Sequence, residues 1–272
     1  MAKLFNQILT SIDGFVWGVP LIVLILAVGV FLTIRVKGLQ IRLLPRAIKE
    51  LFVNEKSGDS GEVSSFAALC TALSATIGTG NIVGVATAIV AGGPGALFWM
   101  WMAALFGMAT KFAEGVLAIK YRVLDETGHA LGGPFYYIEN GMGKQWKWLA
   151  KLFAFFGVGV GILGIGTITQ VNGIASAVNN FFDSNNAWTF QLFGKDYSYT
   201  VLIAAIIVTV CVALVIIGGI QRIASVSQII VPFMACIYVA FCVLLLIMNV
   251  TKIPAAFVLI IQSAFGMRAV AG

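Results

Sequence analysis

The chain has 272 residues, of which 60% are hydrophobic and only 10% are charged, and its mean hydropathy is +1.00. Soluble domains carry about one quarter charged residues, so the composition excludes an ordinary soluble protein and predicts an all-α membrane protein in a lipid bilayer. The net charge of +6 is explained by basic loops between spans, so we expect no nucleic-acid partner.

No motif of an enzyme accompanies the apolar segments. The sequence contains no nucleophile–base constellation, phosphate-binding loop or metal-ligand spacing. All four cysteines lie in apolar segments without a CxxC motif or a histidine cluster, so we expect free thiols. The sequence therefore predicts a protein that is not an enzyme and that needs no cofactor.

After an amphipathic lead-in at the N-terminus, apolar runs predict six membrane-spanning helices. A bilayer core requires roughly 17 to 20 residues in helical conformation, and each run reaches that length. The predicted spans are Val16 to Ile34, Ser64 to Ala91, Ala96 to Tyr121, Leu149 to Phe182, Tyr199 to Ile217 and Val226 to Asn249. A further apolar stretch begins at Pro254.

Basic residues are distributed unevenly between the two sides of these spans. The loops after the first, third and fifth spans contain twelve lysines and arginines, whereas the opposite side contains three, Lys3, Lys195 and Lys252. Lysine and arginine in short loops mark the cytoplasmic side. We therefore expect a multi-pass protein of the cell (inner) membrane with its N-terminus outside.

The second span contains an unusual polar centre between Thr71 and Gly84. Gly78 and Gly80 lower the cost of leaving helical geometry, and the neighbouring threonines and asparagine can bond the freed backbone groups. A helix broken at membrane depth is tolerated where it lines a cavity, as in many secondary transporters. The alternative is a continuous helix in which Gly80 and Gly84 form a packing seam.

Few other polar groups lie within the spans. Lys111 and Glu114 are three residues apart in the third span, either as a structural pair near the helix end or as a functional intramembrane pair. In the fourth span, Gln170 and Asn172 follow a glycine run, Gly157 to Gly166, that would permit close approach to a neighbouring helix. These two side chains either line a cavity or form hydrogen bonds between helices.

Four segments resemble the sodium:alanine (alanine or glycine:cation) symporter family, in that family's order. They are Gly92-Gly-Pro-Gly-Ala-Leu-Phe-Trp-Met-Trp-Met-Ala-Ala-Leu-Phe-Gly107, Ser74 to Asn81, Gly133 to Glu139 and Gly218 to Ile223. The resemblance implies a LeuT-type fold, in which a peripheral helix precedes two five-helix repeats of inverted topology. It also implies symport of a small neutral amino acid, alanine or glycine, by alternating access, with the sodium ion as co-substrate.

Members of this family have more spans than the six predicted here. We therefore interpret residues 1–63 as the lead-in, peripheral helix and cytoplasmic loop, 64–249 as the first repeat, and 250–272 as the start of a truncated second repeat. On this interpretation the C-terminal repeat is a missing partner and the chain is an N-terminal fragment. Two alternatives stay open, a non-transporting half-transporter and an ion channel.

The resemblance assigns ligand roles to the broken second span. Backbone N–H groups that open its outer half are expected to hold the substrate carboxylate. The expected substrate-binding residues are Thr76, Gly78, Thr79, Gly80, Asn81 and Gln170. Carbonyl oxygens that end its inner half are expected to face sodium, because hard cations prefer such ligands. The expected sodium-binding residues are Ser74, Ala75, Ile77 and Asn81.

Overall fold

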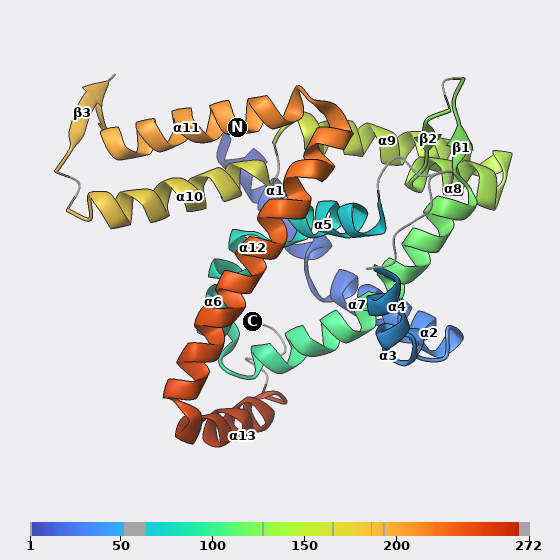
Figure 1. The fold of residues 1–272 in the computed structure, drawn as a ribbon, viewed down its shortest axis with the longest axis horizontal. Coiled ribbons are helices and arrows are strands. Elements are labelled where there is room, and N and C mark those ends of the chain that lie inside the picture. The colour runs from blue at the N-terminus through green and yellow to red at the C-terminus, as the bar shows by residue number, and fades with distance from the viewer. Residues whose placement is uncertain are drawn as a thin grey trace. The chain divides into compact units, whose positions relative to one another are not determined.

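The computed structural model describes residues 2–51, 64–126, 128–164, 166–185, 187–192 and 194–266 (Figure 1). The chain forms two compact units. Unit 1 consists of Met1–Val53, Thr87–Ala150 and Thr251–Gly272, and unit 2 consists of Asn54–Ala86 and Lys151–Val250.

Helices make up most of both units. Those of unit 1 are α1 (Ala2–Val16), α2 (Val19–Arg35), α3 (Leu39–Arg42), α4 (Leu44–Leu51), α7 (Ala96–Lys120), α8 (Pro134–Met142), η2 (Lys144–Trp146) and α13 (Ile253–Ser263). Those of unit 2 are α5 (Ser65–Thr76), η1 (Thr79–Asn81), α10 (Thr167–Phe182), α11 (Tyr199–Ile216) and α12 (Gly219–Met248). Three more, α6 (Val83–Gly92), α9 (Lys147–Ile162) and η3 (Val250–Lys252), cross the boundary between the units.

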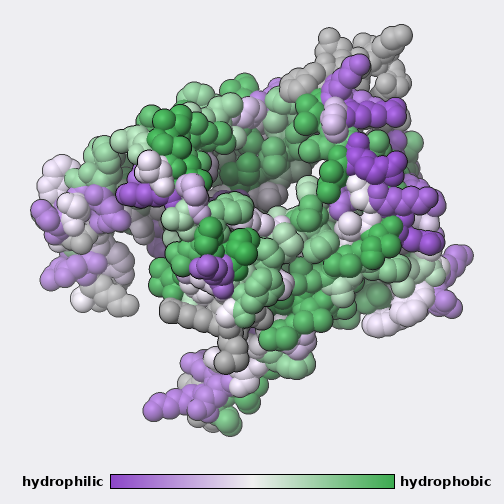
Figure 2. Space-filling view, turned by 90° about the horizontal axis from the view of Figure 1, so that it is seen from below, coloured by the Kyte–Doolittle hydropathy of each residue, from purple (hydrophilic) through white to green (hydrophobic). Residues whose placement is uncertain are grey.

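Several of these helices have the length and composition of membrane spans. Among the described residues there are five such segments, Asn6–Arg35, Ala96–Lys120, Lys144–Phe182, Tyr199–Ile216 and Gly219–Met248, and a bent pair of helices makes a sixth. Hydrophobic side chains cover much of the face shown in Figure 2, as expected where lipid chains replace water around a protein. The prediction of an all-α, multi-pass membrane protein is confirmed.

The fourth span differs from its prediction as one long helix. It consists of α9 and α10, and the residues between them include Gly164 and Gly166, with φ angles of +61° and +89°. Positive φ is accessible to glycine at little cost, so these glycines interrupt the helix. We expected the glycine run to let a neighbouring helix approach closely. In the described part of the chain no neighbour approaches Gly157 or Gly161, because a Cβ added at either glycine would meet nothing within 4 Å.

Two antiparallel hairpins lie in loops that the sequence left without regular structure. One pairs β1 (Val123–Leu124) with β2 (Ala130–Leu131), and the other pairs β3 (Thr189–Leu192) with β4 (Lys195–Ser198). Each has only two strands, so the overall class remains all-α with short β connections.

In unit 1, α7 packs against both α2 and α13. The indole Nε1 of Trp99 on α7 donates to the carbonyl oxygen of Ala264, at 2.7 Å, just after α13 ends. A Cβ added at Gly95 would collide with the carbonyl oxygen of Ser263. The glycine therefore permits the close approach of α13 to the start of α7, and the indole satisfies a carbonyl that the helix leaves unpaired.

In unit 2, α5 packs against α12, and α10 runs beside α11 with the β3–β4 hairpin joining them (Figure 1). Most of the buried residues on α5 and α12 are small, which lets two helices approach closely without large side chains between them. At the end of α10, both carboxylate oxygens of Asp183 accept backbone N–H groups, from Ala187 at 2.8 Å and Trp188 at 2.9 Å. Hydroxyls of Ser198 and Thr200 donate to Asn179 Oδ1. These bonds fix the connection between α10 and α11.

Candidate functional site

The predicted break in the second span is present. The axis of α5 (Ser65–Thr76) differs by 68° from that of the following helical segment, Thr79–Gly92. Between them Ile77 has ψ of 115°, and Gly78 is fully extended at φ −158° and ψ −164°. The alternative of a continuous helix with a glycine packing seam is therefore wrong.

At the break, side-chain oxygens accept the hydrogen bonds of two backbone N–H groups. In a continuous helix the N–H groups of Gly78 and Thr79 would pair with the carbonyls of Ser74 and Ala75, four residues earlier. Here the Gly78 N–H donates to Asn81 Oδ1 at 3.2 Å, and the Thr79 N–H donates to Oε1 of Gln170 on α10 at 2.8 Å. The carbonyl oxygens of Ser74 and Ala75 are thereby released from helical pairing.

Gln170 makes a second bond to the same residue. The hydroxyl of Thr79 also donates to Gln170 Oε1, at 2.8 Å. Two glycines permit this approach: a Cβ at Gly78 would lie 2.5 Å from Gln170 Nε2, and a Cβ at Gly173 on α10 would lie 2.7 Å from Thr79 Cγ2. The structure thus brings Thr79 and Gln170, two of the predicted substrate-binding residues, into contact. No pattern in the sequence distinguishes Gly173 from the other glycines.

Two of the predicted ligand residues direct their side-chain hydroxyls back to their own helix. Thr76 Oγ1 donates to the carbonyl of Ala72 at 2.9 Å, and Ser74 Oγ donates to that of Thr71 at 2.7 Å. Their oxygen lone pairs remain able to accept, as do the released carbonyls. Within this chain the predicted ligands Ser74, Ala75, Thr76, Gly80 and Asn81 are exposed, and Ile77, Gly78, Thr79 and Gln170 are half-buried. The break therefore presents oxygen acceptors and a helix N-terminus on an accessible surface.

The charged pair of the third span lies in unit 1. Lys111 Nζ and Glu114 Oε2 on α7 are 2.7 Å apart, so the ion pair itself is formed. Helix α8, between two spans, packs against α7 and carries Tyr137. Burial raises the pKa of Tyr137, the Glu114 carboxylate raises it further, and the Lys111 ammonium partly offsets the increase. In the described part of the chain, no group of three or more histidine, cysteine or carboxylate side chains is placed to hold a metal ion.

Comparison with known proteins identifies the family. The sequence profile of the sodium:alanine symporter family matches residues 1–272. The chain is 54% identical over 267 residues to an uncharacterized transporter of Haemophilus influenzae, covering 98% of this chain and 55% of that protein. It is 46% identical over 268 residues to the sodium/alanine symporter AgcS of Methanococcus maripaludis, covering 97% and 56%.

A third relative carries a different substrate in its name. The chain is 34% identical over 273 residues to the probable sodium/glutamine symporter GlnT of Bacillus subtilis, covering all of this chain and 53% of that protein. The chain thus spans just over half the length of these curated relatives. Because the family profile matches along the whole sequence, the chain belongs to the sodium:alanine symporter family.

Proposed function

We propose that this chain supplies one part of the binding site of a sodium-coupled symporter that carries a small neutral amino acid, alanine or glycine, by alternating access. The observation that carries the proposal is the release of the Ser74 and Ala75 carbonyls at the helix break. Unpaired carbonyls at a helix C-terminus concentrate negative potential, which suits a hard monovalent cation. Residues 64–249 would then form the first repeat of a LeuT-type fold.

The proposed sodium site uses the carbonyl oxygens of Ser74, Ala75 and Ile77. Asn81 Oδ1 adds a fourth oxygen, since an amide oxygen that accepts one bond from Gly78 keeps a second lone pair. In this arrangement the asparagine has two roles. It holds the backbone of the break open by accepting the Gly78 N–H, and it contributes to the coordination of the ion.

The proposed carboxylate site lies on the other half of the break. The N–H and hydroxyl of Thr79 both donate to Gln170 Oε1, so this amide oxygen occupies the place that a substrate carboxylate oxygen would take. On binding, the carboxylate accepts the two Thr79 donors, and Gln170 turns so that its Nε2 group donates to the substrate. The space beside Gly80 is open, since a Cβ there would meet nothing within 4 Å.

Sodium and substrate sites on adjacent turns of one broken helix provide a physical basis for coupling. A cation held by the carbonyls favours the nearby carboxylate, and the carboxylate favours the cation in return. This chain covers just over half of its relatives' sequences. We expect the groups that receive the amino end of the substrate to correspond to the part of the relatives that it does not cover. The names of two relatives motivate testing both alanine and glutamine as substrates.

The test is uptake of labelled alanine into liposomes that contain the purified full-length protein. We expect saturable accumulation driven by an inward sodium gradient, with glycine as a competitor and no accumulation when potassium replaces sodium. Flux that rises linearly with concentration and ignores the gradient would instead indicate a channel. Monodisperse protein that binds neither alanine nor sodium would support a non-transporting half.

A further inference from the structure

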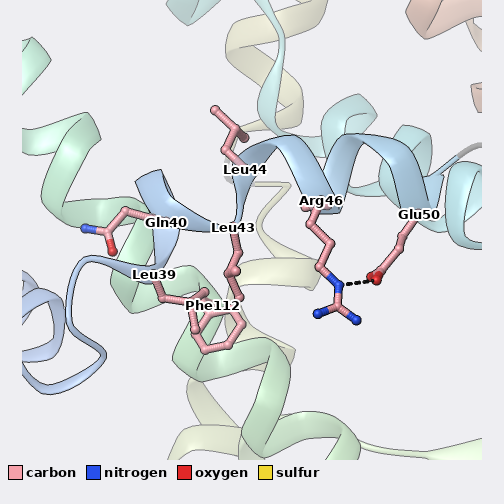
Figure 3. Close-up of a pocket in the computed structure, with 8 residues that line it drawn as sticks. Leu39, Gln40, Leu43, Leu44, Arg46, Glu50 and Phe112 are labelled. Atoms are coloured by element: carbon pink, nitrogen blue, oxygen red, sulfur yellow. Dashed lines mark hydrogen bonds and ion pairs between the residues drawn. The ribbon is translucent and has the colours of Figure 1, made fainter.

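A cavity and a basic segment occur together where the first span ends. Helices α3 and α4 adjoin α7 around a cavity of about 390 Å³. In Figure 3, Leu39 of α3 and Leu43, which separates α3 from α4, point toward Phe112 on α7. The part of the wall formed by Leu39, Leu43 and Phe112 is therefore apolar, and Gln40, Arg46 and Glu50 also line the cavity.

The eight residues of α4 form a strongly amphipathic helix. Its apolar residues recur at the spacing of one helical face, at Leu44, Ala47, Ile48 and Leu51, and its opposite face carries Arg46, Lys49 and Glu50. The apolar side chains of Leu44 and Ile48 are 51% and 50% exposed. A helix of this pattern that follows a membrane span is suited to lie in the bilayer interface, with its apolar face toward the acyl chains.

Charge specifies what can occupy this surface. Between residues 35 and 51 there are five basic side chains, Arg35, Lys37, Arg42, Arg46 and Lys49, and one carboxylate, Glu50. They begin at Arg35, the last residue of the first candidate span. A basic cluster immediately after a span attracts anionic headgroups. The leucines and Phe112 that line the neighbouring cavity offer an apolar surface to an acyl chain.

We propose that the surface formed by α3, α4 and Phe112 binds an anionic phospholipid, with an acyl chain in the cavity and its phosphate at Arg42, Arg46 and Lys49. Arg46 donates to Glu50 through Nε at 2.8 Å, and its terminal nitrogens extend beyond that contact (Figure 3). Arg42 reaches the carbonyl of Lys37 through one Nη at 3.4 Å, which is a long bond that a phosphate can replace. Among the described residues that line the cavity, Glu50 has the one carboxylate, and it opposes the anion.

The test is native mass spectrometry of the full chain in an uncharged detergent, titrated with phosphatidylglycerol or with phosphatidylcholine of the same acyl chains. We expect phosphatidylglycerol to be retained in preference to phosphatidylcholine. The triple variant Arg42→Gln/Arg46→Gln/Lys49→Gln should lose this preference, by on the order of fivefold for each charge removed. The Glu50→Gln variant should strengthen it.

Two further variants distinguish binding at this site from non-specific electrostatic attraction of anionic lipid. The variant Lys120→Gln/Lys144→Gln/Lys151→Gln removes the same charge from the loop after the third span and should leave the preference unchanged. Ala47→Leu fills part of the cavity and should weaken retention of both lipids while the protein stays monodisperse. An equal loss in the control triple variant, full competition by inorganic phosphate, or a dimer that buries α4 in place of lipid would each overturn the proposal.

Discussion

Thr79 and Gln170, 91 residues apart in sequence, meet at a single atom: the N–H and the hydroxyl of Thr79 each donate to Gln170 Oε1 at 2.8 Å. The amide of Gln170 therefore supports the helix break as well as standing at the proposed carboxylate site. Removing it should affect stability and binding separately, because the two depend on different properties of the side chain.

We predict that Gln170→Ala destabilises the protein by about 1–3 kcal/mol, since a half-buried N–H loses its acceptor, and that it also abolishes substrate binding. Gln170→Glu keeps an acceptor for Thr79 and should retain most of the stability. It places a negative charge where the substrate carboxylate would bind, so alanine binding should still be lost. Thermal unfolding and sodium-dependent binding of labelled alanine measure the two effects, with Asn172→Ala as the control on the same helix.

The two glycines of the break should respond differently to substitution. A Cβ at Gly78 would lie 2.5 Å from Gln170 Nε2, whereas one at Gly80 would meet nothing within 4 Å. Because Thr79 holds that amide in place, Gly78→Ala should displace Gln170 and lower alanine affinity by at least about tenfold, or roughly 1.4 kcal/mol. Gly80→Ala should leave unfolding unchanged. Equal loss of affinity and stability in both variants would contradict this account.

These two glycines also show where sequence-based prediction reaches its limit. The break itself could be predicted as one of two interpretations, because glycines and small polar residues in an apolar span fit either a broken helix or a packing seam. Which glycine must lack a side chain could not, because that depends on Gln170, whose position opposite Gly78 is set by the packing of α10. Gly173, which approaches Thr79, is likewise one glycine among many until the helices are placed.

The details of the connections between helices also depend on contacts that the sequence alone does not reveal. A connection between α10 and α11 follows from the gap between the fourth and fifth predicted spans, yet the β3–β4 hairpin and its anchors were not predicted. The anchor bonds depend on which side chains the hairpin returns to the helix end, as when Ser198 reaches Asn179. Single-residue preferences carry no information about such pairs.

The pair of Lys111 and Glu114 provides a test of structural against functional charge. The ion pair is 2.7 Å long. Within a membrane span an unpaired charge is costly, so each side chain depends on the other for neutralisation. We expect Lys111→Glu and Glu114→Lys each to lower the yield of folded protein and the double reversal to restore it, measured by size-exclusion chromatography. A folded double variant without transport would assign the pair a functional role.

The titration of Tyr137 should report on the pair of Lys111 and Glu114. Burial, followed by the Glu114 carboxylate, raises the pKa of Tyr137 above its ordinary value of 10.0. The folded state thus binds the phenolic proton more strongly than the unfolded state, and this stabilisation is present below pH 10 and is lost as the pH rises through the raised pKa. Glu114→Gln should lower the pKa, measured by phenolate absorbance with Tyr137→Phe as the blank. An unchanged pKa would remove Glu114 as a cause.

The asymmetry of basic residues predicts the orientation of the chain. In a background without native cysteines, Lys49→Cys on α4 should react with an impermeant maleimide only after cells are opened. Asp196→Cys, exposed on β4, should react in intact cells. The opposite pattern would place the N-terminus inside and contradict the expectation from charge.

The packing of α5 against α12 also determines the order in which the chain can fold during synthesis. Helices α10 and α11 are neighbours in sequence, so they can associate as soon as both have entered the membrane. The partner of α5, α12, is made last among the helices of unit 2, after α10 and α11 have left the ribosome. Until α12 is inserted, α5 lies in the bilayer without its main packing partner. Destabilising substitutions in α12 should therefore populate an early folding intermediate that an insertase or a membrane protease can recognise.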